Sequence, residues 1–132
     1  MALGQSNAAV VTLRANPGGQ FIVNAVINGA ESRALVDTGA TTVALNRNEA
    51  ARLGIVWDTT RRLQFSTAGG VRFGYPATAA TMQVGGIGLA NVPVVVMEGG
   101  AEQLSITLLG MSFLRHVDMF RTGDTMILTQ RQ

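Results

Sequence analysis

The feature of this sequence that most constrains its fold is an acidic residue at the end of an apolar strand. The apolar run 34–36 leads directly into Asp37-Thr38-Gly39. Aspartate usually lies in turns, where its side chain bonds to the nearby backbone. A carboxylate beside a buried strand is costly unless polar partners satisfy it. The fold must therefore supply hydrogen-bond donors to Asp37.

Short apolar runs separated by glycine-containing turns predict an all-β fold around this motif. The chain has 132 residues, which is the size of one domain, and 16 of them are glycine. The clearest hairpin covers residues 21–36, because Asn28-Gly29 is a favoured two-residue turn. The same pattern predicts strands over 9–14 and 104–109 and further hairpins over 78–97 and 120–128.

Two short helices are predicted between the strands. Asn46 can cap a helix whose third residue is Glu49, and Gly54 can end it in a left-handed conformation, so we expect a helix over about 47–53. A second short helix is expected over about 111–117. The remaining segments carry no helical period.

The order of the predicted elements repeats along the chain. A hairpin, a strand and a short helix surround Asp37-Thr38-Gly39, and the same elements surround Leu108-Leu109-Gly110. A long hairpin over about 63–81, with its tip at Ala68-Gly69-Gly70, lies between the two halves. This pattern predicts an internal duplication with a pseudo-two-fold axis.

Composition excludes several other classes of function. The net charge is only +2 and the arginines are scattered, whereas nucleic-acid binding predicts a basic stripe. Cysteine is absent and His116 is the single histidine, so we predict no metal, no cofactor and no Ser-His-Asp triad. The longest apolar run, 92–97, is much shorter than the roughly 20 residues of a membrane-spanning helix.

Three motifs together resemble the retropepsin-like aspartic proteases. They are Leu35-Val36-Asp37-Thr38-Gly39-Ala40, the hairpin tip Thr67-Ala68-Gly69-Gly70, and Leu108-Leu109-Gly110 followed by a helix. The last motif is most similar to bacterial single-domain members. The resemblance covers about residues 20–130 and implies an all-β, retropepsin-like half-barrel with a pseudo-two-fold hairpin repeat and one or two short helices, forming a single protease domain over 1–132.

The resemblance also implies the roles of particular residues. Asp37 is expected to be catalytic, with Thr38 and Gly39 building its loop, and the hairpin over 63–81 is expected to act as a flap that closes over a peptide. Leu35, Ile106 and Leu108 are expected in the pocket walls, although the same positions fit plain core residues equally well. The full set expected to bind substrate is Leu35, Ala40, Thr41, Thr42, Ala68, Gly69, Gly70, Val71, Ile106 and Leu108.

One Asp-Thr-Gly motif supplies only half of a carboxylate pair. No second copy exists, because Arg121-Thr122-Gly123 lacks the acid and Asp124-Thr125-Met126 lacks the glycine. A catalytic function therefore requires a homodimer in which the two Asp37-Thr38-Gly39 loops meet on the symmetry axis.

The function predicted on this basis is an aspartic endopeptidase that hydrolyses protein or peptide substrates with a water molecule. Two alternatives stay open: a catalytically silent module of the same fold that dimerises or binds peptides, and an unrelated small β-barrel binding protein. Among bacterial relatives of this kind, an N-terminal helix outside the present chain commonly anchors the protein. That arrangement would place the domain at the periplasmic face of the inner membrane.

Overall fold

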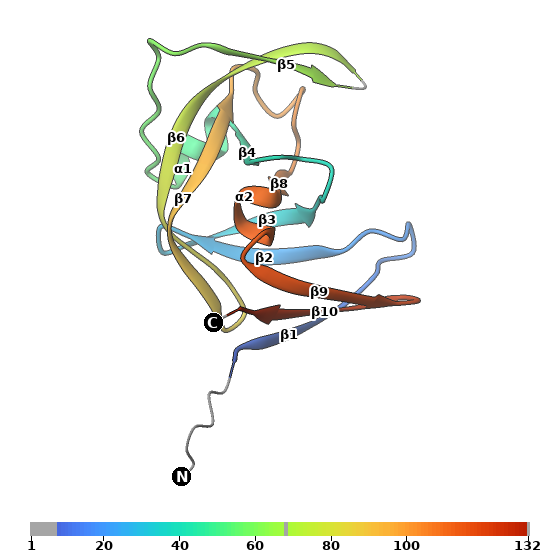
Figure 1. The fold of residues 1–132 in the computed structure, drawn as a ribbon. Helices are drawn as coiled ribbons and strands as arrows, with labels where there is room; N and C mark the ends of the chain where they lie inside the picture. The colour runs from blue at the N-terminus through green and yellow to red at the C-terminus, as the bar shows by residue number, and fades with distance from the viewer. Residues whose placement is uncertain (1–7, 68, 132) are drawn as a thin grey trace.

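The computed structural model describes residues 8–67 and 69–131. β-Strands dominate this part of the chain, which confirms the predicted all-β fold class (Figure 1). The elements are β1 (Val10–Arg14), β2 (Ile22–Ile27), β3 (Ala30–Val36), β4 (Val43–Asn46), α1 (Arg47–Arg52), β5 (Leu63–Thr67), β6 (Gly70–Val84), β7 (Ile87–Met97), β8 (Thr107–Leu109), α2 (Met111–Leu114), β9 (Val117–Thr122) and β10 (Thr125–Gln130).

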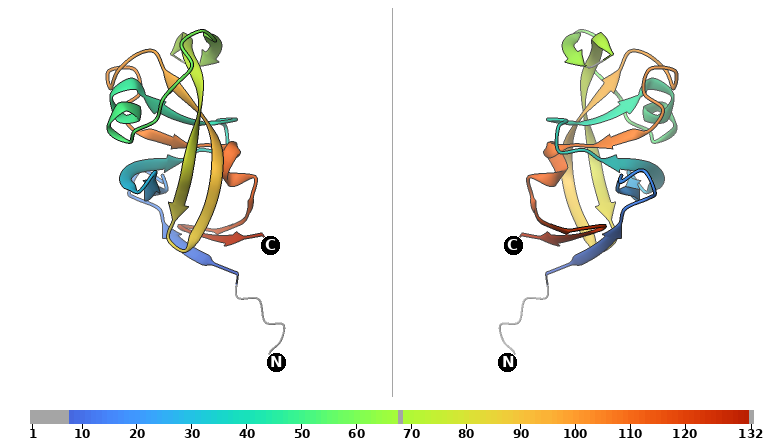
Figure 2. Two further views of the ribbon diagram at one scale, coloured as in Figure 1. Left: turned by 90° about the vertical axis from the view of Figure 1, so that its left-hand side faces the viewer. Right: turned by 90° about the vertical axis from the view of Figure 1, so that its right-hand side faces the viewer.

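The strands form two sheets. The larger sheet has the order β2-β3-β8-β4-β7-β6-β5, and an additional pairing of β2 with β6 closes it into a barrel. The smaller sheet has the order β1-β10-β9, and it lies at the opposite end of the molecule from β5 (Figures 1 and 2). Fully buried side chains from both sheets and from α2, including Ile27, Met82, Phe113 and Leu128, fill the interior.

The first hairpin forms as its turn residues predict. Asn28 and Gly29 both have positive φ, 52° and 85°, which a two-residue turn of this kind requires. The Asn28 side chain also accepts a hydrogen bond from the backbone N–H of Ala80 at 2.8 Å and donates one to the carbonyl of Leu53 at 3.2 Å. One turn thus connects β2–β3 with β6 and with the end of α1.

Helix α1 begins where its capping residue predicts. The Asn46 side chain accepts the N–H of Glu49 at 2.7 Å, and Gly54, just beyond the helix, has a φ of 70°. The Asn46 amide also donates to the carbonyl of Leu104 at 2.9 Å, which ties the cap to the segment that enters β8.

Two predicted boundaries were wrong. The second helix ends at Leu114 rather than near residue 117, because Val117 begins β9 and pairs with Gln130 of β10. The long hairpin predicted to end near residue 81 pairs only from Leu63 to Gly74, and beyond Gly74 the strand β6 leaves β5 and pairs with β7. Tertiary strand pairing overrides local propensity in both places.

The two strands that precede the repeated motifs, β3 and β8, end next to each other in the sheet. Strands β3 and β8 lie side by side and parallel, with Val36 opposite Leu109. The residues that follow, Asp37 and Gly110, therefore leave the sheet at the same level. No helix in the described part of the chain is long and apolar enough to cross a membrane.

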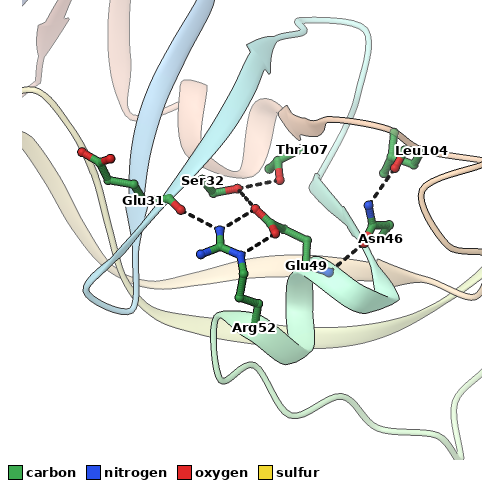
Figure 3. A network of polar contacts seen from close by, with 7 residues as sticks. All are labelled: Glu31, Ser32, Asn46, Glu49, Arg52, Leu104 and Thr107. Carbon is green, nitrogen blue, oxygen red and sulfur yellow. Dashed lines mark hydrogen bonds and ion pairs between the residues drawn. The ribbon is translucent and has the colours of Figure 1, made fainter.

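A polar network fastens α1 to these two strands (Figure 3). The Ser32 hydroxyl donates to Glu49 Oε2 at 2.7 Å and lies 2.9 Å from the Thr107 hydroxyl, which must be the donor in that contact because Ser32 has a single hydroxyl hydrogen. Arg52 donates to both carboxylate oxygens of Glu49 and to the carbonyl of Glu31. The hydrogen bond from Arg52 lowers the pKa of Glu49, while burial opposes this shift and Ser32 reinforces it.

We expect Ser32→Ala to lower the free energy of unfolding by about 1–2 kcal/mol, because it leaves Thr107 and Glu49 short of a partner in a buried position. Urea denaturation measures this change. Ser105→Ala, at an exposed serine just before β8, is the matched control and should change stability by less than about 0.5 kcal/mol. Equal effects of the two substitutions would show that the network contributes no stability.

Candidate active site

The loop that follows β3 holds a carboxylate by its backbone. The Gly39 N–H donates to Asp37 Oδ1 at 2.9 Å, and the Ala40 N–H donates to the Asp37 carbonyl at 3.2 Å. The Asp37 N–H in turn donates to the carbonyl of Leu109 at 3.1 Å. Within the described residues, Oδ2 accepts no hydrogen bond, so one oxygen of this partly buried carboxylate stays available to a further partner.

Gly39 is closely packed against the carboxylate that it binds. A Cβ at this position would lie 3.2 Å from Asp37 Oδ1, which is tighter than an ordinary van der Waals contact. A residue without a side chain thus allows the backbone N–H to reach the acid.

Gly110 makes the closest approach to the loop from the β8 side. A Cβ on Gly110 would lie 2.5 Å from the carbonyl oxygen of Thr42 and 2.8 Å from that of Ala40. The next residue, Met111, donates its N–H to the same Ala40 carbonyl at 2.8 Å. Helix α2 and the loop are therefore packed backbone to backbone.

The Ser112 hydroxyl completes this contact. It accepts the N–H of Val43 at 2.9 Å and donates to the carbonyl of Pro93 at 2.7 Å. Ser112 is almost fully buried, so its hydroxyl replaces water for two backbone groups. The start of β4, the strand β7 and α2 are joined at this one side chain.

A cavity of about 560 Å³ opens beside the carboxylate. Seven of the residues predicted from the sequence line it: Asp37, Gly39, Ala40, Thr41, Thr42, Gly69 and Leu108. Sequence reasoning missed nine others: Ala44, Phe65, Ser66, Thr67, Arg72, Val95, Met97, Gln103 and Leu104. Ala44 closely follows the Asp37 loop, and Phe65, Ser66, Thr67 and Arg72 belong to the predicted hairpin. Val95, Met97, Gln103 and Leu104 are remote from both in the sequence, and only the closed sheet brings them to the site.

The remaining predicted residues lie elsewhere. Leu35, Thr38, Gly70 and Ile106 are not among the lining residues, and Val71 lines a separate cavity of about 270 Å³. Thr38 is exposed. Ala68 lies outside the described residues.

The β5–β6 hairpin forms the roof of the larger cavity. Figure 1 shows its tip extended above the loop that follows β3. Thr67 donates from its hydroxyl to the carbonyl of Gly70 at 2.7 Å, and Gly70 has a φ of 111°, which only glycine adopts readily. A two-stranded hairpin with such a tip has little stability of its own.

An ion pair holds the base of this hairpin. Arg62 donates two hydrogen bonds of 2.9 Å to the two carboxylate oxygens of Glu98, and the Tyr75 hydroxyl donates to Oε2 at 2.7 Å. The Arg62 guanidinium also stacks on the Phe73 ring, 3.7 Å from its centroid. The hydrogen bonds from Arg62, followed by that from Tyr75, lower the pKa of Glu98 to about 2.

Within the described residues, no group of three or more His, Asp or Glu side chains lies close enough together to hold a metal ion. The chemistry that the site itself offers is that of a single carboxylate beside a largely apolar cavity. Such a carboxylate can accept a proton from water or donate one, according to its state.

A family model and several relatives match this chain. Residues 23–116 match the family described as "gag-polyprotein putative aspartyl protease". The crystal structure of a retropepsin-like aspartic protease from Rickettsia conorii has a TM-score of 0.75 and 28% identity, covering 98% of this chain and 96% of that chain.

Two curated relatives are known only as uncharacterised proteins. One, from Rickettsia prowazekii, is 30% identical over 111 residues, which cover 83% of this chain and 46% of the relative. The other, encoded in the cobV 5′ region of a Sinorhizobium species, is 31% identical over 115 residues, which cover 84% of this chain and 47% of the relative. The chain thus spans about half the length of the curated relatives that it matches.

We expect Gly110→Ala to lower the free energy of unfolding by about 1–3 kcal/mol, because the added methyl group meets two backbone carbonyls that cannot move aside. Thermal and urea unfolding measure the loss. In the control Gly88→Ala, the new Cβ would be 3.5 Å from the nearest atom, so stability should stay near that of the wild type. A neutral Gly110→Ala variant would contradict the close approach described above.

We expect Glu98→Gln to loosen the β5–β6 hairpin, because it removes the charge that binds Arg62. Hydrogen exchange of the backbone amides in 63–74 should become several-fold faster, whereas Glu102→Gln in the same loop should leave it unchanged.

The same ion pair predicts a pH dependence. The pKa of Glu98 in the folded protein is about 2, well below the ordinary glutamate value of 4.5, so the stabilisation is complete above about pH 4.5 and is lost as the pH falls through about 2. Titration of the Glu98 carboxyl by NMR checks this, and a midpoint near 4.5 would contradict it.

Proposed function

The chain belongs to the retropepsin-like aspartic proteases, and from that premise we propose that it is an endopeptidase in which Asp37 is catalytic. The observation that carries the proposal is the geometry of this carboxylate. One oxygen is held by the Gly39 N–H, the other accepts no hydrogen bond within the described residues, and both belong to a residue that lines the large cavity.

The proposed enzyme is a homodimer, because peptide hydrolysis of this kind requires two carboxylates and the sequence contains one Asp-Thr-Gly motif. Two Asp37 side chains facing each other across a two-fold axis would share one proton, since ionising both at about 3 Å is unfavourable. The exposed position of Thr38 supports this arrangement, because its side chain is accessible to the loop of a second copy.

In the proposed mechanism, the ionised carboxylate of the pair accepts a proton from a water molecule that attacks the peptide carbonyl. The protonated partner donates a hydrogen bond to the carbonyl oxygen, and a proton then passes to the leaving amine. The hydroxyl and methyl groups of Thr41 and Thr42 would contact the substrate backbone. The role proposed for the β5–β6 hairpin is that of a flap, which would close over the bound peptide and exclude water.

The walls of the cavity suggest the kind of side chain that it accepts. Ala44, Val95, Met97, Leu104 and Leu108 present an apolar surface next to Asp37. An apolar side chain adjoining the cleaved bond would remove this surface from water and contribute to binding.

We expect Asp37→Asn to lower peptide cleavage by roughly 10³-fold or more, because the amide cannot accept a proton from water. The substitution preserves size, so sedimentation velocity should show an unchanged dimer. Asp58→Asn, at an exposed turn outside the cavity, is the control and should cleave normally. A variant Asp37→Asn that still cleaves would defeat the catalytic assignment.

A mixing experiment tests whether the two halves of the site come from different chains. Excess Asp37→Asn protein should suppress wild-type activity as mixed dimers form. Undiminished activity would indicate that one chain is sufficient. Peptide binding and dimerisation by a wild-type protein that never cleaves would instead favour a catalytically silent module of the same fold.

A further inference from the structure

One arginine of the β5–β6 hairpin faces the large cavity. Arg72 on β6 lies directly opposite Phe65 on β5, and both side chains line the cavity. The guanidinium folds over the tip of the hairpin, since a Cβ on Gly69 would lie 3.1 Å from Arg72 Nη2. Its single hydrogen bond within the described residues is from Nη1 to the carbonyl of Val71, at 3.1 Å.

Arg72 and Asp37 are the two charged residues among those that line this cavity. Within the described part of the chain, no carboxylate lies at ion-pair distance from Arg72. Three other arginines do have such partners: Arg52 pairs with Glu49, Arg62 with Glu98, and Arg131 with Asp118.

The two carboxylates that line the smaller cavity together with Arg72 already accept hydrogen bonds. Glu98 accepts from both Arg62 and Tyr75, and Glu102 accepts the N–H of Gly100 at 3.0 Å. Both glutamates line the smaller cavity, to which Arg72 also contributes. Arg72 therefore brings to the larger cavity a positive charge that these side chains do not bond.

Closure of the hairpin over a peptide would remove water from this guanidinium. Removing water from the guanidinium is unfavourable if no anion takes its place. A peptide carboxylate within reach would accept a charge-assisted hydrogen bond from it. Asp37 would repel a peptide carboxylate close to the cleaved bond, so the acid must lie on the Arg72 side of the cavity. Because the cavity wall between Asp37 and Arg72 is apolar, the peptide residue that lies against this wall should carry an apolar side chain.

We propose that Arg72 is a specificity-determining residue, which selects peptides that carry an aspartate or glutamate flanking an apolar residue at the cleavage site. This inference rests on the proposed function. In a symmetric dimer both halves of the cleft present the same guanidinium, so the preference applies on both sides of the cleaved bond.

The test uses peptides with one constant apolar core, in which each flanking position in turn carries Glu or Gln. At one or more positions on each side, the wild-type protein should cleave the Glu peptide with a kcat/KM about tenfold higher than the Gln peptide. The ratio should fall as the salt concentration rises from about 50 mM to about 500 mM, because dissolved ions screen the attraction between Arg72 and the carboxylate of a peptide that has not yet been enclosed.

Three variants assign this preference to its residue. Arg72→Gln should reduce the Glu/Gln ratio to about one, and Arg72→Lys should keep part of it because the charge remains. Arg33→Gln removes the same charge from an exposed position on β3 outside the cavity, and it should leave the ratio unchanged. A wild-type ratio near one, or a ratio that survives Arg72→Gln, would overturn the inference.

Binding to the Asp37→Asn variant separates this inference from the proposed function. The same labelled peptides, followed by fluorescence polarisation, should bind more tightly with Glu than with Gln, and Arg72→Gln in that background should abolish the difference. Selective binding by the Asp37→Asn variant, together with no cleavage of any peptide by the wild-type protein, would support the role of Arg72 and refute the endopeptidase. Cleavage without selectivity would refute the role of Arg72 alone.

Discussion

The position of the acidic loop depends on a contact between two backbones. Gly110 lies so close to residues 40–42 that a single added carbon would overlap the Thr42 carbonyl, and Met111 donates its N–H to the carbonyl of Ala40. Because main-chain atoms on both sides are held by strands β3, β4 and β8, the loop has little room to shift. The Asp37 carboxylate is thereby presented to the cavity by a rigid frame.

The hairpin above the cavity is held less firmly than the acidic loop. The β5–β6 hairpin pairs only with itself as far as Arg72, because Phe73 accepts the N–H of Glu98 and Gly74 pairs with Met97 of β7. It is fastened at its base by Glu98, Arg62 and Tyr75. Its glycine tip adds little rigidity. A rigid Asp37 loop below and a loosely held hairpin above would allow an extended peptide to enter the cleft and then be enclosed. The proposed function relies on this arrangement.

Local sequence signals predicted the elements whose ends are marked by turn or capping residues. Asn28-Gly29 specified a hairpin turn, and Asn46 with Gly54 specified the limits of α1, because each residue acts through its own backbone or its near neighbours. The end of α2 and the length of the β5–β6 hairpin were wrong for a common reason. Val117 pairs with Gln130 at the far end of the β9–β10 hairpin, and β6 pairs with β7 beyond Gly74. Both boundaries depend on how far a hairpin extends from its turn, which the turn residues do not specify.

The sequence by itself determined the all-β class, the retropepsin-like family and the acidic loop on which the proposal is centred, since these depend on turn residues and on a contiguous motif. Only the tertiary structure decided which side chains surround Asp37. Phe65, Arg72, Val95 and Leu104 reach the same cavity from four separate segments because the closed sheet folds them together. Contacts between residues far apart in the chain depend on strand order and register, and neither can be read from the neighbours of a single residue.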